Sequence, residues 1–492
     1  INIFRLQQAA EKKRRKLDEN QDFEMAETLF YGKAANRIEK LEAMADDATV
    51  IMKEAGITLD QAEEYAYAMN AKERNAMLLE RDGVEDGSGM SDAEADAILD
   101  SYKKDETKIG PDQKSDIEKI HSLFMKVTAE DRKLQVESGL MSEEQIAEQE
   151  KSQPNYVPLM GFATDETFNA EEKTRTTYSS GSQGAEFDVR GKEGKRAKGR
   201  KTKAANVLSH LLTNSAAVRI RAERNMALQK LYTLVEQNPN PDVWTIVKPG
   251  QPLDEKGADN RVGVKINGEQ HYIRFANASY AQSLQGMGTE RLNAVGKFLR
   301  VPNNWLRRSF TSVSPEFIVT NFSRDIQAAV VNAVAETDIE GGMISGKSDV
   351  VRKIIKKVPQ TLKALLRESV TGQADITIGK YYAEFKEDGG KTGWAYAKNL
   401  VERKEGLEKA LSKGDHPFLN KGKAILGFVE GINDAVENSI RLAAYIEARE
   451  AGVSREKAAQ LGKNITINFN KQGEMTGVLN TLYLFFNASV QG

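Results

Sequence analysis

Apolar residues recur at three- and four-residue steps over most of this chain, the period of amphipathic α-helices. In the stretch from Phe30 to Met44, for example, the apolar positions fall on one helix face. Glycine-rich loops are expected to separate further helices within 338–422. The other predicted helices cover 4–55 (one helix or a pair), 58–80, a segment opened by Ser91 or Asp92, 112–138, 142–150, 203–238, a segment from 289 onward, one starting near Pro315, and 422–451.

The hydrophobic period changes from about 3.6 to two just after Pro241. Three short runs rich in β-branched and aromatic residues follow, at 243–247, 262–266 and 272–275. Asn267-Gly268, between the last two runs, is a typical hairpin turn sequence. The expected fold class is therefore mainly α and multi-helical, with a small antiparallel β insert around 242–276.

The stretch after residue 151 contains Pro154 and Pro158, is then rich in serine, threonine and glycine, and is predicted to be a linker or long loop. The expected organisation is a helical region at 1–153, an extended segment at 154–205, a helix plus the β insert at 206–288, and a helical domain at 289–492. Because the sequence starts with Ile1 and ends without a recognisable terminal signal, it is expected to be a segment of a longer polypeptide.

The composition narrows the chemistry. There is no cysteine, which excludes disulfides, cysteine-based zinc sites and thiol nucleophiles. No two of the four histidines are spaced to bind a metal from one helix face, and the common hydrolase and metalloprotease motifs are missing. We therefore expect no catalytic, cofactor-binding or metal-binding residues and no enzymatic activity. The rival is an enzyme whose site is assembled from residues far apart in the sequence.

The net charge of −2 hides an uneven distribution. Residues 1–150 carry a net charge of −14, and the remaining residues carry +12. Such asymmetry favours self-association or contact with an anion such as DNA. Solvated helix faces are the more common explanation of such charges.

A basic run between 190 and 203 is the candidate nucleic-acid contact. It could bind a phosphate backbone without recognising sequence, but it contains no aromatic residue for base stacking. A solvated loop is the favoured alternative. The candidate residues are Arg190, Lys192, Lys195, Arg196, Lys198, Arg200, Lys201 and Lys203.

A second group of polar residues lies within apolar helical patterns. Asn321, Arg324 and Asp325 share one predicted helix, and Glu437 and Arg441 are one turn apart on another. Buried charges need partners, so we predict a structural network in which Arg324 or Asp325 pairs with Glu437 or Arg441. A ligand-binding or catalytic cluster is the less favoured interpretation.

Several strings resemble those of a known family. The N-terminal part carries Tyr67–Ala76, Gly87–Ala95 and Pro158–Ala163. In the last of these, Gly161 and Ala163 replace the arginine and glycine of a Pro-Leu-x-Arg-Phe-Gly motif. In the C-terminal part, five strings stand in family order: Ser314–Phe317, Asn321–Asp325, Glu437–Ala443, Asn468–Gly473 and Phe485–Gly492. The chain resembles the large polyvalent proteins of phages and prophages, including a polyvalent protein-associated domain.

This resemblance implies a structural segment of an internal virion protein that is ejected into the host with the genome and helps to form the DNA-translocation assembly. Expected partners are other copies of itself, other internal virion, portal or tail proteins, phage DNA bound non-specifically, and a membrane after ejection. The expected location is the virion interior, then the host envelope or cytoplasm. The alternative is a delivered effector or counter-defence protein without a role in the particle.

Overall fold

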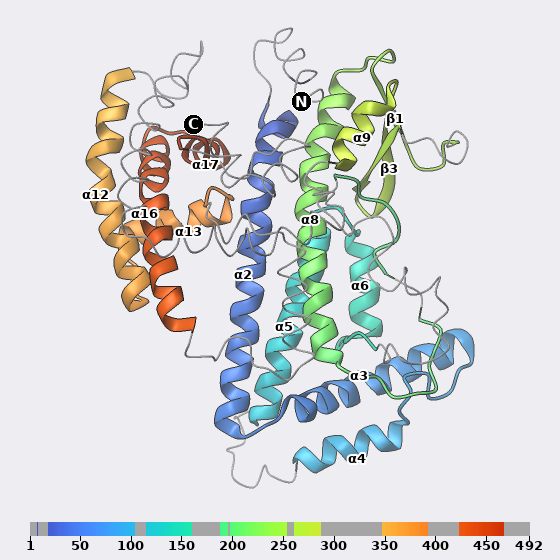
Figure 1. Ribbon diagram of the computed structural model, residues 1–492. Helices are drawn as coiled ribbons and strands as arrows, with labels where there is room; N and C mark the ends of the chain where they lie inside the picture. The colour runs from blue at the N-terminus through green and yellow to red at the C-terminus, as the bar shows by residue number, and fades with distance from the viewer. Residues whose placement is uncertain are drawn as a thin grey trace, which may run out of the picture.

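The computed structural model describes Gln7 and residues 18–103, 115–159, 187–194, 197–252, 260–286, 347–391 and 423–466. Helices dominate these residues, and a single small antiparallel sheet lies on one side (Figure 1). The predicted fold class, mainly α with a small β insert, is confirmed.

The long helix α2 (Phe23–Ala55) lies in the middle of the molecule (Figure 1). It follows a short 3-10 helix, η1 (Glu19–Gln21), and starts where the Asp22 carboxylate accepts a hydrogen bond from the Met25 amide. It ends at Gly56, whose φ of 68° is the left-handed conformation that glycine adopts at little cost. On one side α2 packs against α5 (Asp116–Glu137) and α8 (Val207–Gln237).

Three further helices complete the N-terminal part. α3 (Leu59–Asp82) and α4 (Asp92–Lys103) lie across the C-terminal end of α2, and α6 (Glu143–Ser152) lies beside α5 (Figure 1). Thr58 and Ser142 each form a capping box with a glutamine three residues later. The helix starts expected at these two positions are therefore confirmed.

The sheet has the order β1-β3-β2, with β1 at Trp244–Val247, β2 at Arg261–Ile266 and β3 at Glu269–Phe275. Asn267 and Gly268 join β2 to β3 with positive φ angles of 49° and 79°, as a tight hairpin requires. The short helix α9 (Ala278–Gly286) follows. The buried side chain of Asn225 on α8 connects the helices to β2, because its amide bonds both the carbonyl and the N–H of Lys265.

The segment 187–194, within the predicted linker, contributes buried side chains to the core. Phe187 and Val189 are fully buried, and the Val189 amide donates to the Gly263 carbonyl of β2. The alternation of apolar and polar residues from Phe187 to Arg190 is what lets this segment pack along the sheet. One core cluster joins Phe187 to Phe23 of α2 and Val262 of β2, so three of the four predicted regions share a core.

The C-terminal part contains α12 (Lys347–Thr371), α13 (Ile376–Glu387), α16 (Lys423–Glu450) and α17 (Arg455–Asn464). α12 packs along α16, while α13 and α17 contact α2. Met25 and Leu29 of α2 belong to the same core cluster as Phe385 and Tyr445. The described C-terminal residues therefore share a core with the N-terminal part, and α2 is common to both.

Candidate functional site

One half of the predicted polar network, Glu437 and Arg441 on α16, lies within the described residues. The guanidinium of Arg441, only 1% exposed, donates from Nη1 to Glu437 Oε1 over 2.7 Å and from Nε to Thr466 Oγ1 over 2.8 Å. Asn321, Arg324 and Asp325 lie outside the described residues. The ion pair within α16 thus exists, and the pairing between two helices stays a prediction.

Internal contacts hold much of the basic run. Arg190 pairs with Asp188 over 2.8 Å and lies over the Tyr272 ring. Arg200 donates to the carbonyls of Thr202 and Lys203, and Lys203 pairs with Glu94 over 2.7 Å.

The outward-facing part of the run consists of four lysines. Lys192, Lys198, Lys201 and the Glu94-paired Lys203 are exposed, whereas Lys195 and Arg196 lie outside the described residues. Nucleic-acid binding by this run stays a prediction that rests on these exposed lysines.

Glu193, the one acid in the basic run, has a structural role that the sequence analysis missed. Its buried carboxylate bonds the Arg221 guanidinium over 2.8 Å and lies 3.5 Å from the Lys265 ammonium. Burial lowers the pKa of Lys265, and Glu193 acts in the opposite direction. The sequence signal for this role is a single glutamate three residues after the alternating segment Phe187–Arg190. Its partners could not be predicted from the sequence.

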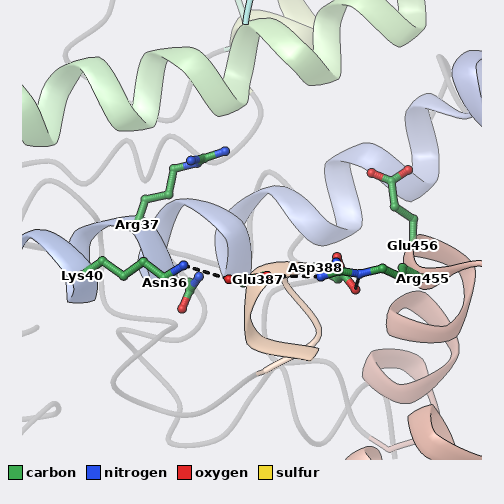
Figure 2. A pocket seen from close by; sticks show the side chains of 7 residues that line it. All are labelled: Asn36, Arg37, Lys40, Glu387, Asp388, Arg455 and Glu456. Carbon is green, nitrogen blue, oxygen red and sulfur yellow. Dashed lines mark hydrogen bonds and ion pairs between the residues drawn. The ribbon is translucent and has the colours of Figure 1, made fainter. Parts of the chain in front are cut away.

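A polar cleft lies where α2, α13 and α17 meet, and we call it the junction cleft (Figure 2). Its volume is about 450 Å³. The lining side chains come from segments more than 300 residues apart in the sequence: Asn36, Arg37, Lys40, Glu387, Asp388, Arg455 and Glu456. The cleft therefore lies between a helix of the N-terminal part, α2, and two helices of the C-terminal part, α13 and α17.

Two of the ion-pair groups that cross this junction include residues that line the cleft. The Glu456 carboxylate of α17 lies 2.7 Å from Lys33 of α2 and 2.5 Å from Lys230 of α8. Burial alone would raise the pKa of Glu456, but the two lysines outweigh it and lower that pKa to about 2. A single carboxylate thus links three helices.

The second group surrounds Asp388, at the end of α13. Arg455 donates to Asp388 over 2.9 Å and to Glu387 over 3.3 Å, while Lys40 pairs with Glu387 over 3.0 Å (Figure 2). The Tyr445 hydroxyl of α16 also bonds Asp388, over 3.1 Å. Burial and the neighbouring Asp388 carboxylate raise the pKa of Tyr445, so its hydroxyl stays protonated and donates.

Beside the cleft the backbones of α2 and of the turn after α13 touch. A Cβ atom on Gly32 would collide with the Gly389 carbonyl, and one on Gly389 would collide with the Leu29 carbonyl. The φ of 77° at Gly389 independently favours glycine. Only residues without a side chain permit this approach.

The ammonium of Lys463 on α17 lies next to this backbone contact. It is fully buried and donates to the Gly389 carbonyl over 3.2 Å. The pKa of Lys463 is lowered to about 7, mainly by burial. Glu27 acts to raise this pKa, and the Arg441 guanidinium acts with burial to lower it. This amine is therefore a titratable group at the junction that responds near neutral pH.

The chemistry of the junction is that of paired charges. Among the described residues, no group of three or more histidine or carboxylate side chains is arranged to hold a metal ion. Within the same residues, no helix combines the length and the apolar character that crossing a bilayer requires. Lysine and arginine side chains pair with Glu387, Asp388 and Glu456, which suits the cleft to holding helices together.

Comparisons with known proteins add no relatives. No protein-family model matches the chain, and no curated protein and no solved structure matches it significantly.

Replacing Lys463 by methionine should change how stability depends on pH. The pKa of this lysine is about 7 in the folded chain and 10.5 as its ordinary value. Between these values the unfolded chain binds the additional proton, so wild-type stability should rise with pH relative to K463M. Urea unfolding of both proteins at pH 7, 8.5 and 10 measures this. A stability difference that stays constant over the series would contradict the assignment.

Replacing Gly389 by alanine should separate α13 from α2. Gly56 is a matched control because its φ is 68° and its Cβ would meet nothing within 4 Å. G56A should lose about 1–2 kcal/mol from the left-handed conformation alone. G389A should lose a further amount of about 1–3 kcal/mol from overpacking. Equal losses in urea unfolding would show that the close contact contributes nothing.

Proposed function

We propose that this chain is a structural segment of a large internal virion protein of a bacteriophage, released into the host with the genome as part of the DNA-translocation assembly. The observation that carries this proposal is the series of five C-terminal strings in family order, from Ser314–Phe317 to Phe485–Gly492. Within the described residues, Glu437–Ala443 of this series lies in the buried part of α16. That string therefore belongs to the core of the C-terminal part.

The way the helices are held together suits a protein that must unfold to pass through a narrow tube. The sequence has no cysteine and hence no disulfide that would resist unfolding. Ion pairs such as Glu456 with Lys33 and Lys230 connect the distant segments. Such contacts can break and re-form without covalent chemistry, which supports the proposed passage.

The charge distribution supports association between copies. Much of the acidic excess is at the surface; on α6, for example, the side chains of Glu143, Glu144, Glu148 and Glu150 are exposed. The rest of the chain carries a net charge of +12. Head-to-tail contacts between unlike surfaces close into rings when the rotation permits. A ring in or near the portal and tail channel is the assembly we propose.

Purified particles of the phage that encodes this chain provide the test. Quantitative mass spectrometry should find the protein in several copies in intact particles and should find it depleted from particles after triggered DNA release. A protein absent from intact particles and present only in infected cells would refute the proposal. That outcome would favour a delivered effector or counter-defence protein instead.

A further inference from the structure

The outer face of α12 is an exposed surface to which the proposed function assigns no residues. A membrane is among the partners expected for that function, so an inference about this face rests on it and deepens it. Figure 1 shows α12 as the outermost helix on its side of the molecule. Its inner face is occupied, because Ile354, Val358 and Leu365 are buried towards α16. Lys357, on the same side, pairs with Glu447 over 2.8 Å and with Glu450 over 2.7 Å. α12 is therefore fixed to the core and presents its other face to the surroundings.

Basic side chains form a straight row on that outer face. Arg352, Lys356, Lys363 and Arg367 are all exposed. At 100° and 1.5 Å per residue they lie within about 60° of one another and extend over about 22 Å. Within the described ranges, Arg352, Lys356 and Lys363 have no carboxylate partner; Arg367 donates to the Gln373 side chain over 3.1 Å. Within the described residues, this row is therefore exposed positive charge that no carboxylate neutralises.

Apolar side chains stand among these cations. Ile355 is 44% exposed and Val370 is 56% exposed, and Pro359 lies between them on the same face. Ile376, which opens α13 shortly after α12, is 95% exposed. Of the five large hydrophobic side chains recorded as exposed in the described part of the chain, these three belong to α12 and the start of α13.

We propose that this outer face of α12 binds the surface of an anionic lipid bilayer. Lysine and arginine near such a surface are attracted to its acidic headgroups, and each adds to the affinity. Exposed isoleucine, valine and proline side chains gain by leaving water at the boundary between headgroups and acyl chains. Against a nucleic-acid backbone the same apolar side chains would meet charged phosphates and gain nothing, so the mixed face favours lipid.

Binding to vesicles by the 492-residue chain tests this inference independently of the particle experiment. In a flotation assay, wild type should bind vesicles of equal parts phosphatidylglycerol and phosphatidylcholine, and should not bind phosphatidylcholine alone. K356E/K363E should lose at least about tenfold in affinity. The control K53E/K151E reverses two exposed lysines on α2 and α6 and should bind like wild type.

The apolar side chains supply a second variant. I355S/V370S should also weaken binding to the anionic vesicles while the row of cations is intact. Circular dichroism melting of every variant shows that each is folded. The inference is overturned if wild type does not bind anionic vesicles, or if K356E/K363E binds as tightly as the control. It is likewise overturned if the substitutions abolish only duplex DNA binding or self-association and leave vesicle binding unchanged.

Discussion

The fold depends on the burial of one helix on two sides. α2 contributes Phe23 and Phe30 to the core shared with α8 and the sheet, and Met25 and Leu29 to the core shared with α16. A helix covered on both sides needs close neighbours on each. On the C-terminal side this is possible because Gly32 and Gly389 let two backbones touch. The two glycines thus allow the described N- and C-terminal parts to pack closely, and ion pairs such as Lys33 with Glu456 add to this contact.

Charge then fixes the helices that the glycines bring together. Glu456 is one-quarter exposed and is shared by cations from two helices, an arrangement that keeps it ionised. Lys463 is in the opposite situation, because its buried amine has a carbonyl as its hydrogen-bond partner and loses its proton readily. The junction therefore combines an ion pair that persists over a wide pH range with one amine that titrates near neutrality.

Local patterns in the sequence predicted the elements well. The change of hydrophobic period located the strands, and Thr58 and Ser142 marked helix starts, because both signals depend on residues close together in the chain. The junction could not be predicted in this way. Lys33 and Glu456 are 423 residues apart, and neither belongs to a motif.

The candidate sites show the same division between local and long-range information. The ion pair of Glu437 with Arg441 follows from helical spacing and is present. The role of Glu193 depends on Arg221 and Lys265, which approach it only once α8 and the sheet are packed. In the basic run, Arg190 and Arg200 bind groups of the chain itself, whereas the row on α12 is exposed because that helix packs against α16 through its other face.

The Glu456 carboxylate pairs with Lys33 and Lys230, so it should couple α17 to α2 and α8 as one cooperative unit. Native-state hydrogen exchange on wild type and E456Q measures this coupling, with E148Q at an exposed position of α6 as the control. Amide exchange in E456Q should be faster on both sides of the junction, in α17 and around Lys33 and Lys230. Faster exchange confined to α17, with α2 and α8 as protected as in wild type, would contradict it.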